Sequence, residues 1–413
     1  MAGAPDLDEL AALYRDLHAH PELAFAEHRT AGIVAERLSG LGYQVTTGVG
    51  GTGVVGLLSN GQGPTVLLRA DMDGLPVLER TDLPYASTGR GRDSGGGDVP
   101  VMHACGHDMH VTCLLGAAAQ LAAARDAWRG TLLLVFQPAE EAGKGARAMI
   151  DDGLYARFPV PDIVLGQHVM PLPAGVLAVH SGPAMAGADA LRVVLHGEGG
   201  HGSRPETTVD PILMAAAAVL RLQGVVSREL AASETAVLTV GALRAGTAPN
   251  IIPDQAELLL SLRFFNDKVH RKARAAIDRI IRAEAAASGA AKEPEITTDV
   301  SFPVLVNDPA ACARLTEMFN AGGTLTLDPG PVTGSEDVGL LAAAAGVPCA
   351  YWFLGGSDPA LFAGVTTVEE ARAIVDTLPS NHSPLFAPVI DPTIRTGVAA
   401  LTAAAREWLG TAG

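Results

Sequence analysis

The hydrophobic pattern of residues 1–185 alternates between short apolar runs and amphipathic segments. Three runs, each bounded by glycine, proline or charged residues, are apolar over most positions: TVLLRAD (65–71), GTLLLVFQ (130–137) and DIVLGQHV (162–169). Such runs are typical of strands buried on both faces of a parallel sheet. Leu10, Leu13 and Leu17 have helical spacing, and an Ala-rich stretch predicts a buried helix to about Ala124. The pattern predicts an α/β domain with helices on both faces of a largely parallel sheet.

The pattern changes near residue 185. Three segments then alternate polar and apolar residues: DALRVVLHGEGG (189–200), ETAVLTVGALRAG (234–246) and QAELLLSLRFF (255–265). This alternation is typical of antiparallel strands with one solvated face, and helical stretches lie between them. After about residue 297 the apolar strand VPCAYWFLGG and a closing helix restore the first pattern. We therefore predict a main domain, residues 1–185 and 298–413, split by an inserted α+β domain with an antiparallel sheet, residues 186–297.

Composition narrows the possible partners of the chain. Of 413 residues, 48% are hydrophobic and 18% are charged, and the formal net charge is −16. An acidic chain of this kind is unsuited to nucleic-acid backbones or to a basic membrane-binding patch. The N-terminus has no basic segment followed by an apolar core, and the apolar run TCLLGAAAQLAAA is too short to span a bilayer. We expect neither a nucleic-acid partner nor a membrane partner.

The cysteine content bears on the cellular compartment. The four cysteines, Cys105, Cys113, Cys312 and Cys349, are too few for a disulfide framework in a chain of this length. A reducing cytoplasm is the location that this usage favours.

Two short motifs have ordinary structural interpretations. GVGGTG (48–53) matches the dinucleotide-binding pattern, but a strand and a turn follow it where that pattern requires a helix. A hairpin turn is therefore predicted. NHS (381–383) matches the glycosylation triplet, which has no meaning in a chain without a secretion signal.

The stretch MHACGHDMH (102–110) concentrates three histidines and one cysteine in nine residues. Gly106 allows the chain to turn so that the side chains of Cys105 and His107 converge. A thiolate and an imidazole suit a borderline-soft metal such as zinc. A nucleophilic cysteine with His107 as its base, or a buried structural cysteine, would explain this segment equally well.

FQPAEEAGKG (136–145) adds two adjacent carboxylates, Glu140 and Glu141, at the carboxyl end of an apolar strand. Active sites of open α/β sheets gather at these ends. Because neighbouring side chains point in different directions, one glutamate can bind a metal while the other acts as general base. A solvated helix start would produce the same pair.

Two further histidines extend this set. His168 ends an apolar strand, and His382 lies in a polar loop. With these, five side chains of mixed nitrogen, oxygen and sulfur type fall at predicted strand ends or in loops: Cys105, His107, Glu141, His168 and His382. A closed structural zinc site needs four ligands, whereas five suit a two-metal hydrolytic site with shared ligands and open positions.

The chain resembles the amidohydrolase branch of metallopeptidase family M20, in order and over nearly its whole length. The stretches that carry the resemblance include DLHAHPELAFAEHRTAG, LRADMDGLPV, MHACGHDMHVTCLLGAA, VFQPAEEAGKGARAMIDDGL, GQHVMPLPAG, GGHGSRPETTVDPI, GTAPNIIPDQAEL, GSEDVG and NHSPLF. The resemblance implies a catalytic domain split by an inserted lid that usually dimerises. It also implies that the five side chains above hold two divalent metal ions, with Glu140 as the general base.

The resemblance assigns roles to the inserted domain as well. His201 resembles the lid histidine that reaches a partner subunit's active site and polarises the scissile carbonyl. Asn250 and Arg263 resemble residues that hold the carboxylate of the substrate, for which an arginine fork is well suited.

The wider family uses an H-x-D motif and a bridging aspartate, and here that motif becomes Arg69-Ala70-Asp71. Cys105 then supplies the bridge and His107 the missing imidazole. A soft bridge favours zinc, with manganese, cobalt or nickel as alternatives. Asp71 and Asp73 are interpreted as partners that orient imidazoles or as turn residues. His103 and His110 are interpreted as structural residues or as partners of the ligands, not as ligands.

These expectations describe a metal-dependent amidohydrolase that cleaves N-acyl amino acids through a metal-bridging water activated by Glu140. A homodimer formed through the lid is expected. A dipeptidase or carboxypeptidase with the same dinuclear site is the alternative. A thiol enzyme using Cys105, or a non-catalytic metal-binding protein, would also fit parts of the sequence.

Overall fold

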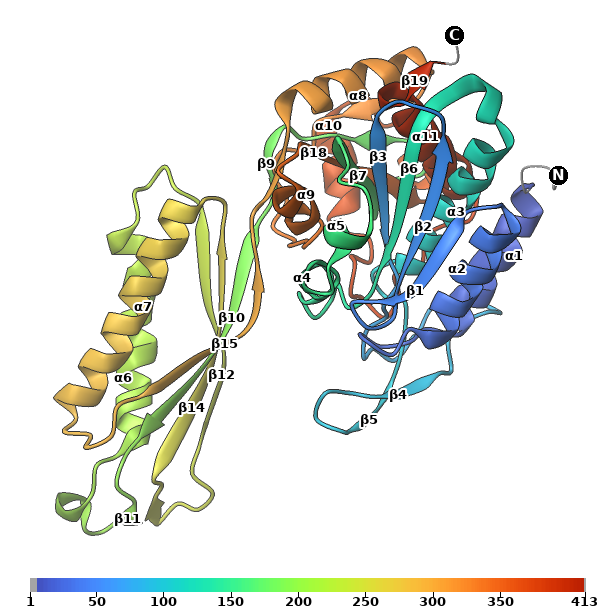
Figure 1. The fold of residues 1–413 in the computed structure, drawn as a ribbon. Coiled ribbons are helices and arrows are strands. Elements are labelled where there is room, and N and C mark those ends of the chain that lie inside the picture. The colour runs from blue at the N-terminus through green and yellow to red at the C-terminus, as the bar shows by residue number, and fades with distance from the viewer. Residues whose placement is uncertain (1–5, 412–413) are drawn as a thin grey trace. The chain divides into compact units, whose positions relative to one another are not determined.

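The computed structural model describes residues 6–411 (Figure 1). The chain forms two compact units. The main unit comprises the residues up to Gly182, Val306–Gly330 and the residues from Asp337 onward. The inserted unit comprises Pro183–Leu305 together with Pro331–Glu336. The domain bounds expected from sequence, 1–185, 186–297 and 298–413, did not include this short return of the chain to the inserted unit, and they stay a prediction.

A nine-stranded sheet forms the centre of the main unit, and its four inner strands, β6, β3, β7 and β18, are parallel. In sheet order the strands are β1 (Gln44–Val49), β2 (Gly53–Asn60), β6 (Trp128–Gln137), β3 (Thr65–Asp71), β7 (Ile163–Pro173), β18 (Cys349–Ser357), β8 (Leu177–Ala178) and β17 (Thr326–Leu327), while β19 (Gly410–Thr411) pairs with β6. GVGGTG forms the turn between the antiparallel strands β1 and β2, as predicted. The mixed α/β fold with a largely parallel sheet is confirmed.

Helices cover both faces of this sheet (Figure 1). The helices of the main unit are α1 (Leu7–Ala19), α2 (His28–Gly40), α3 (His107–Ala123), α4 (Gly145–Asp151), α5 (Leu154–Arg157), α8 (Pro309–Ala321), α9 (Gly339–Ala345), α10 (Val368–Val375) and α11 (Thr393–Trp408), with short 3-10 turns at Arg125–Ala127 and Pro359–Phe362. The predicted buried helix is α3, which is buried along most of its length and packs against α1, α11 and β3. Smaller pairs are β4 (Arg90–Arg92) with β5 (Asp98–Pro100), and β9 (Gly182–Met185) with β16 (Leu305–Asn307).

The inserted unit has a four-stranded antiparallel sheet in the order β12, β14, β10, β15. Its elements are β10 (Gly187–His196), β11 (Gly200–His201), α6 (Pro211–Gly224), β12 (Ala236–Ala245), β13 (Ile251–Ile252), β14 (Gln255–Phe264), α7 (Asp267–Ala287) and β15 (Glu295–Phe302), with a 3-10 turn at Pro205–Thr207. Leu191, Val193 and Leu195 of β10 are buried in one core with α6 and α7. Arg192 and Val194 alternate with them on the opposite face, which explains the alternating sequence pattern.

One helical segment of the inserted unit is longer than the sequence pattern suggested. Helix α6 continues as a π-helical turn to Glu229, and the segment Pro211–Glu229 is long and apolar enough, by length and composition alone, to cross a bilayer. One side of α6 packs into the core of the unit through Met214, Ala218 and Leu222. The segment is therefore at least in part a core helix of a folded unit.

A buried ionic network fixes the start of α3, which carries the candidate ligand His107. His18 of α1 lies between two carboxylates, with its Nδ1 2.7 Å from Asp108 Oδ2 and its Nε2 2.9 Å from Glu79 Oε1. All three side chains are fully buried. Burial lowers the pKa of His18, but Asp108 and Glu79 outweigh burial and raise the pKa to about 10. The imidazolium therefore ties α1 and the loop around Glu79 to the first turn of α3.

We expect His18→Gln to destabilise the protein by about 3–5 kcal/mol at pH 6, because removal of one partner leaves buried charges uncompensated. The folded-state pKa of His18 is raised from 6.5 to about 10, so its contribution is complete below about pH 6.5 and disappears as the pH rises toward 10. Urea unfolding of wild type and variant from pH 6 to pH 10 measures this difference, which should shrink by at most about 1.4 kcal/mol per pH unit. His20→Gln, at a neighbouring exposed histidine, is the control. A difference that does not change with pH would contradict the charged network.

Candidate metal centre

The candidate ligands lie around the carboxyl ends of the inner strands of the main sheet. Asp73 follows the end of β3, and Glu140 and Glu141 follow the end of β6. His168 lies on β7 beyond its last pair with β3. Cys105 immediately precedes the turn into α3. This edge is where open α/β sheets place their active sites, so the sheet explains why residues far apart in sequence meet here.

The structure brings together all five predicted ligands and Glu140. In each of three groups the ligand atoms lie within 4.8 Å of one another: Cys105 with His107 and His168, Cys105 with Glu141 and His382, and His107 with Glu140 and Glu141. Cys105, His107 and Glu141 each belong to two of these groups, so each lies where a ligand shared between two metal ions would lie. The role of each residue stays a prediction, but their convergence is a property of the fold.

The turn at Gly106 makes this convergence possible. Gly106 has a φ of +79°, and a Cβ at this position would lie 2.3 Å from Val169 Cγ1. Any other residue would therefore meet both backbone strain and a collision. The left-handed turn places the Cys105 side chain within one group of ligand atoms with the first residue of α3, as the sequence pattern predicted.

Hydrogen bonds indicate which ring nitrogen carries the proton in two candidate ligands, His107 and His168. His107 Nδ1 lies 3.2 Å from Asp73 Oδ1, a contact in which the ring N–H donates to the carboxylate. Its Nε2 is buried and has no hydrogen-bond partner. His168 Nδ1 donates to the Val169 carbonyl at 2.9 Å, so its Nε2, 3.5 Å from Cys105 Sγ, carries the lone pair. Outward N–H donation with an inward lone pair is the arrangement of metal-bound imidazoles, so these residues fit a metal.

Asp73 organises both sides of the centre. Besides His107 Nδ1, its Oδ1 accepts the backbone N–H of Glu140 at 3.1 Å, and its Oδ2 accepts that of Glu141 at 3.0 Å. The side chain is fully buried. Of the two interpretations weighed from sequence, imidazole orientation is therefore the one that the contacts support.

Asp71 lies beside His107, with its Oδ2 3.6 Å from His107 Nε2, and it makes further buried contacts. Its carboxylate binds the fully buried guanidinium of Arg69 and lies 2.5 Å from His110 Nδ1. His110 Nε2 in turn accepts the backbone N–H of Val169 at 2.8 Å. These contacts agree with a structural or ligand-orienting role for His110, which stays a prediction. Arg69 stands where the wider family has the histidine of its H-x-D motif. It provides a permanent buried cation, and its guanidinium donates to Gln137, Asp71, Tyr351 and Asp337.

The electrostatics of the centre favour cations. Burial lowers the pKa of His107, but Asp71, Asp73 and Glu141 outweigh burial and raise it to about 10. Burial, followed by the charges of Glu141 and Glu140, raises the pKa of the Cys105 thiol well above its ordinary value. A nucleophilic cysteine needs a depressed pKa, so the surroundings of Cys105 argue against a thiol enzyme. Ionisation of this sulfur calls for a bound cation.

The loop that carries His382 is held by hydrogen bonds to the segment that carries Cys105. His382 has a φ of +70°, and its backbone N–H donates to the Ala104 carbonyl at 2.8 Å. Its Nε2 lies 3.2 Å from Glu141 Oε1. Asn381 donates to the carbonyls of Cys105 and Val169, at 3.3 and 3.1 Å. From sequence, Asn381 was interpreted only as a glycosylation site, so its role at the centre was missed, although an amide beside a candidate ligand was a usable signal.

The three residues predicted to contact substrate from the lid all belong to the inserted unit. His201 pairs with Ile251 in the short ladder of β11 and β13, and Asn250 precedes that ladder. Arg263 is eight residues along β14 from Gln255, which corresponds to about 26 Å. It donates to the Thr333 carbonyl at 2.8 Å and to Ser335 Oγ at 3.0 Å. Within one chain, therefore, the structure keeps His201 near Asn250 but does not bring Arg263 to them.

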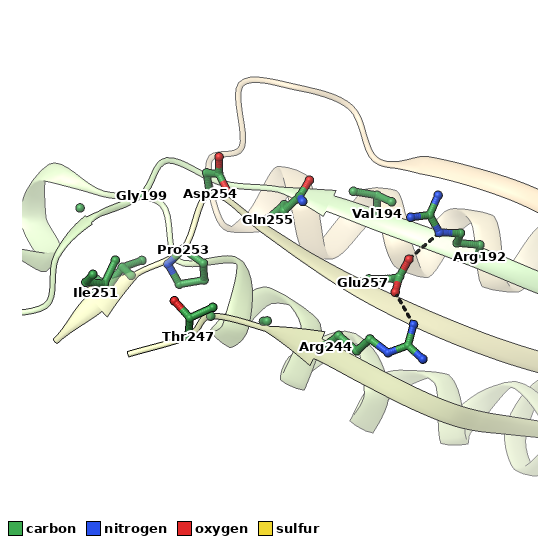
Figure 2. Close-up of a pocket in the computed structure, with 14 residues that line it drawn as sticks. Arg192, Val194, Gly199, Arg244, Thr247, Ile251, Pro253, Asp254, Gln255 and Glu257 are labelled. Carbon is green, nitrogen blue, oxygen red and sulfur yellow. Dashed lines mark hydrogen bonds and ion pairs between the residues drawn. The ribbon is translucent and has the colours of Figure 1, made fainter. Parts of the chain in front are cut away.

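A hollow of about 700 Å³ lies on the inserted unit beside this ladder. Figure 2 shows Glu257 between Arg192 and Arg244, with Thr247 and Ile251 at the other end. Glu257 Oε1 accepts from Arg192 Nε and Oε2 from Arg244 Nη1. None of the five candidate metal ligands lines this hollow.

Comparison with known proteins identifies the family of the chain. The model of "Peptidase family M20/M25/M40" matches residues 67–377. Thermostable carboxypeptidase 1 of Saccharolobus solfataricus is 38% identical over 353 residues, covering 84% of this chain and 86% of the relative. Hippurate hydrolase of Campylobacter jejuni is 38% identical over 351 residues, covering 84% and 88%. The crystal structure of a dinuclear metal-binding M20 peptidase from Bacillus subtilis aligns with a TM-score of 0.73 at 28% identity, covering 97% and 99%.

The fold and the cluster of donors thus define a metal-dependent hydrolase acting on amide bonds. The chain belongs to peptidase family M20, in its amidohydrolase branch.

We expect the metal-free protein to bind two cobalt(II) ions per chain and to develop a sulfur-to-cobalt absorption band in the near ultraviolet, because Cys105 lies in two of the donor groups. Cys105→Ser should abolish the band. Cys113→Ser, at another buried cysteine, is the matched control and should keep it. Titration followed by absorption and by metal analysis checks both points, and an unchanged band in Cys105→Ser would rule out Cys105 as a ligand.

Proposed function

We propose that the protein hydrolyses the amide bond of N-acyl amino acids with two divalent metal ions. The observation that carries this proposal is the position of Glu140. Its carboxylate lies in a donor group with His107 and Glu141, while the two groups that share Cys105 do not need it. The Glu140 carboxylate thus lies beside the candidate ligands without belonging to either of those two groups, and it also lies close to Glu336 and Asp337. A general base is required at such a position. Zinc is the metal proposed, because the shared sulfur is soft, with manganese, cobalt or nickel as alternatives.

The residues of the chain divide the chemistry among them. The metals would supply Lewis acidity and lower the pKa of an attacking water. Glu140 accepts the proton of the water and returns it to the amine of the departing amino acid. Asp73 holds the backbone of Glu140 and the ring of His107, so that base and ligand keep a fixed separation. We propose that His201 stabilises the oxyanion, and that Asn250 and Arg263 bind the substrate carboxylate from different copies of the chain.

A carboxypeptidase or dipeptidase acting through the same site is the second candidate. A relative with 38% identity bears the name carboxypeptidase, and another with the same identity is named a hippurate hydrolase. Both reactions cleave an amide next to a free carboxylate, so the proposed ligands and base serve either one. A panel of N-acetyl, N-benzoyl and indole-acetyl amino acids with dipeptides, assayed after chelation and metal restoration, separates them. Cleavage of dipeptides alone would replace the first proposal by the second.

We expect Glu140→Gln to lower kcat by about 10²–10⁴-fold, because the base is lost while the amide keeps the shape of the side chain. Its metal content should stay at the wild-type value. Glu141→Gln, the neighbouring matched variant, should instead lose metal, because Glu141 is a proposed ligand. Steady-state kinetics and metal analysis of the two variants test the division of roles. Near-normal turnover in Glu140→Gln would refute the assigned base.

We propose that the chain forms a homodimer through the inserted unit, and that His201 acts on the partner subunit's site. Support comes from the exposed apolar side chains of α6, where Leu213 and Leu220 are 69% and 77% exposed. The separation of Arg263 from His201 and Asn250 along β14 also favours a site completed by two chains.

We further propose a reducing cytoplasmic location, which the four free cysteines support.

We expect a mixture of Glu140→Gln and His201→Ala, each nearly inactive alone, to regain about a quarter of the wild-type activity after subunit exchange, because each mixed dimer holds one complete site. Assays before and after exchange measure the recovery. Leu220→Glu should shift the mass in solution to that of a monomer, whereas Leu361→Glu, at an exposed leucine of the main unit, should not. No recovery from a dimer that exchanges subunits would place His201 in its own chain's site.

A further inference from the structure

The backbone next to Glu140 is held by a second buried carboxylate that the proposed chemistry does not use. The N–H groups of Glu140 and Glu141 donate to Asp73. The preceding N–H, that of Ala139, donates instead to Glu27 Oε1 at 2.8 Å. Three successive N–H groups of this loop therefore end on two carboxylates, one from the end of β3 and one from the start of α2.

Ala139 needs this support because of its backbone conformation. It has a φ of +48°, in the left-handed region that residues other than glycine rarely occupy. A conformation of this kind persists only where its surroundings enforce it. Ala139 is also completely buried, so no water can replace a lost partner of its N–H. The conformation of this one residue sets the direction in which the chain enters Glu140.

Burial and hydrogen bonds hold the side chain of Glu27 in place. Its carboxylate is buried, with a residue exposure of 0%. Oε1 accepts the N–H of Phe25 at 3.0 Å as well as that of Ala139, and Oε2 accepts the hydroxyl of Thr52. Phe25, with a φ of +61°, is also left-handed. One oxygen thus binds two of the four non-glycine residues with positive φ among those that the structure describes.

We propose that Glu27 is a positioning residue for the catalytic loop: it holds Ala139 in the left-handed conformation and thereby aims Glu140 and Glu141 at the metal centre. The inference rests on the proposed roles of those two glutamates. Glu27 lies in the segment PELAFAEHRTAG, whose role could not be predicted from sequence beyond the family resemblance. Glu27 belongs to none of the groups of candidate metal ligands found among the described residues, and we propose that it acts through the backbone of Ala139.

Substitutions at positions 27 and 139 test this role of Glu27. Glu27→Met removes the acceptor and fills much of its volume. Glu27→Gln keeps a carbonyl oxygen for the N–H groups of Phe25 and Ala139, and its amide can donate to Thr52. Ala139→Gly removes the conformational cost of positive φ, so a loop with glycine depends less on Glu27. Ala142→Gly is the matched control, because Ala142 lies in the same loop and is not among the residues with positive φ.

We expect Glu27→Met to lower kcat by about 10- to 100-fold, the scale of a misplacement near 1 Å, with KM and metal stoichiometry unchanged. Glu27→Gln should stay within about threefold of wild type, since the acceptor remains. Adding Ala139→Gly to Glu27→Met should restore at least about threefold of the lost kcat, and adding Ala142→Gly should restore none. A merely structural residue would not give a rescue confined to position 139. Equal loss in Glu27→Gln and Glu27→Met, or no rescue by Ala139→Gly, would overturn the proposal.

A spectroscopic measurement tests the role of Glu27 without any substrate. The visible spectrum of the cobalt(II)-loaded protein reports the geometry of Glu141 without turnover. It should change in Glu27→Met and return to the wild-type form with Ala139→Gly. If wild type cleaves nothing in the substrate panel, the proposed function fails, and these spectra alone decide the role of Glu27. If Glu27→Met does not fold, Thr52→Val with and without Ala139→Gly replaces it, with a smaller loss and the same rescue expected. Unchanged spectra in the folded variants would overturn the proposal.

Discussion

The hydrogen bonds to Asp73 are the interactions on which the rest of the centre depends. The parallel register of β3 and β6 pairs Asp71 with Gln137, so Asp73 and Ala139 both lie two residues beyond the last pair. A carboxylate at that point faces the loop after β6 and the first turn of α3 at once. It binds a ring nitrogen 34 residues away and two peptide groups 67 and 68 residues away in sequence. The sheet therefore sets the spacing between ligand and base.

Concentrated negative charge is the second constraint. Asp71, Asp73 and the two glutamates share a region largely excluded from water, where like charges repel more strongly than at the surface. The chain balances part of this charge with the guanidinium of Arg69, which pairs with Asp71. Burial lowers the pKa of His107, but Asp71, Asp73 and Glu141 still raise it to about 10. Divalent cations held by His107 and Cys105 would balance this charge, because metal binding requires a neutral imidazole and an ionised thiol.

The sequence predicted the parts of this structure that depend on local pattern. Apolar runs identified β3, β6 and β7, Gly106 identified the turn between Cys105 and His107, and the alternating strands identified the inserted sheet. It could not predict contacts that depend on where distant backbones meet. Nothing near Asp73 in sequence indicates that it accepts the N–H of Glu140, and nothing near Asn381 indicates that it holds the loop of Cys105.

The inserted unit shows the same limit. Family resemblance grouped Asn250 with Arg263, but it gave no distance between them. That distance follows from the length of β14, which only the sheet register reveals. The short segment 331–336 that joins the inserted unit also has no hydrophobic pattern that would assign it there.

Strand β14 also constrains how this protein can evolve. Arg263 lies near one end of the strand, and the loop with Asn250 precedes the other end. Side chains alternate between the two faces of a strand, so deletion or insertion of a single residue between Gln255 and Arg263 would turn the guanidinium to the helix-covered face. Substitutions on the open face leave the core of the unit in place, because its buried side chains come from the other face. The position of Arg263 therefore depends more on the length of this strand than on most of the residues around it.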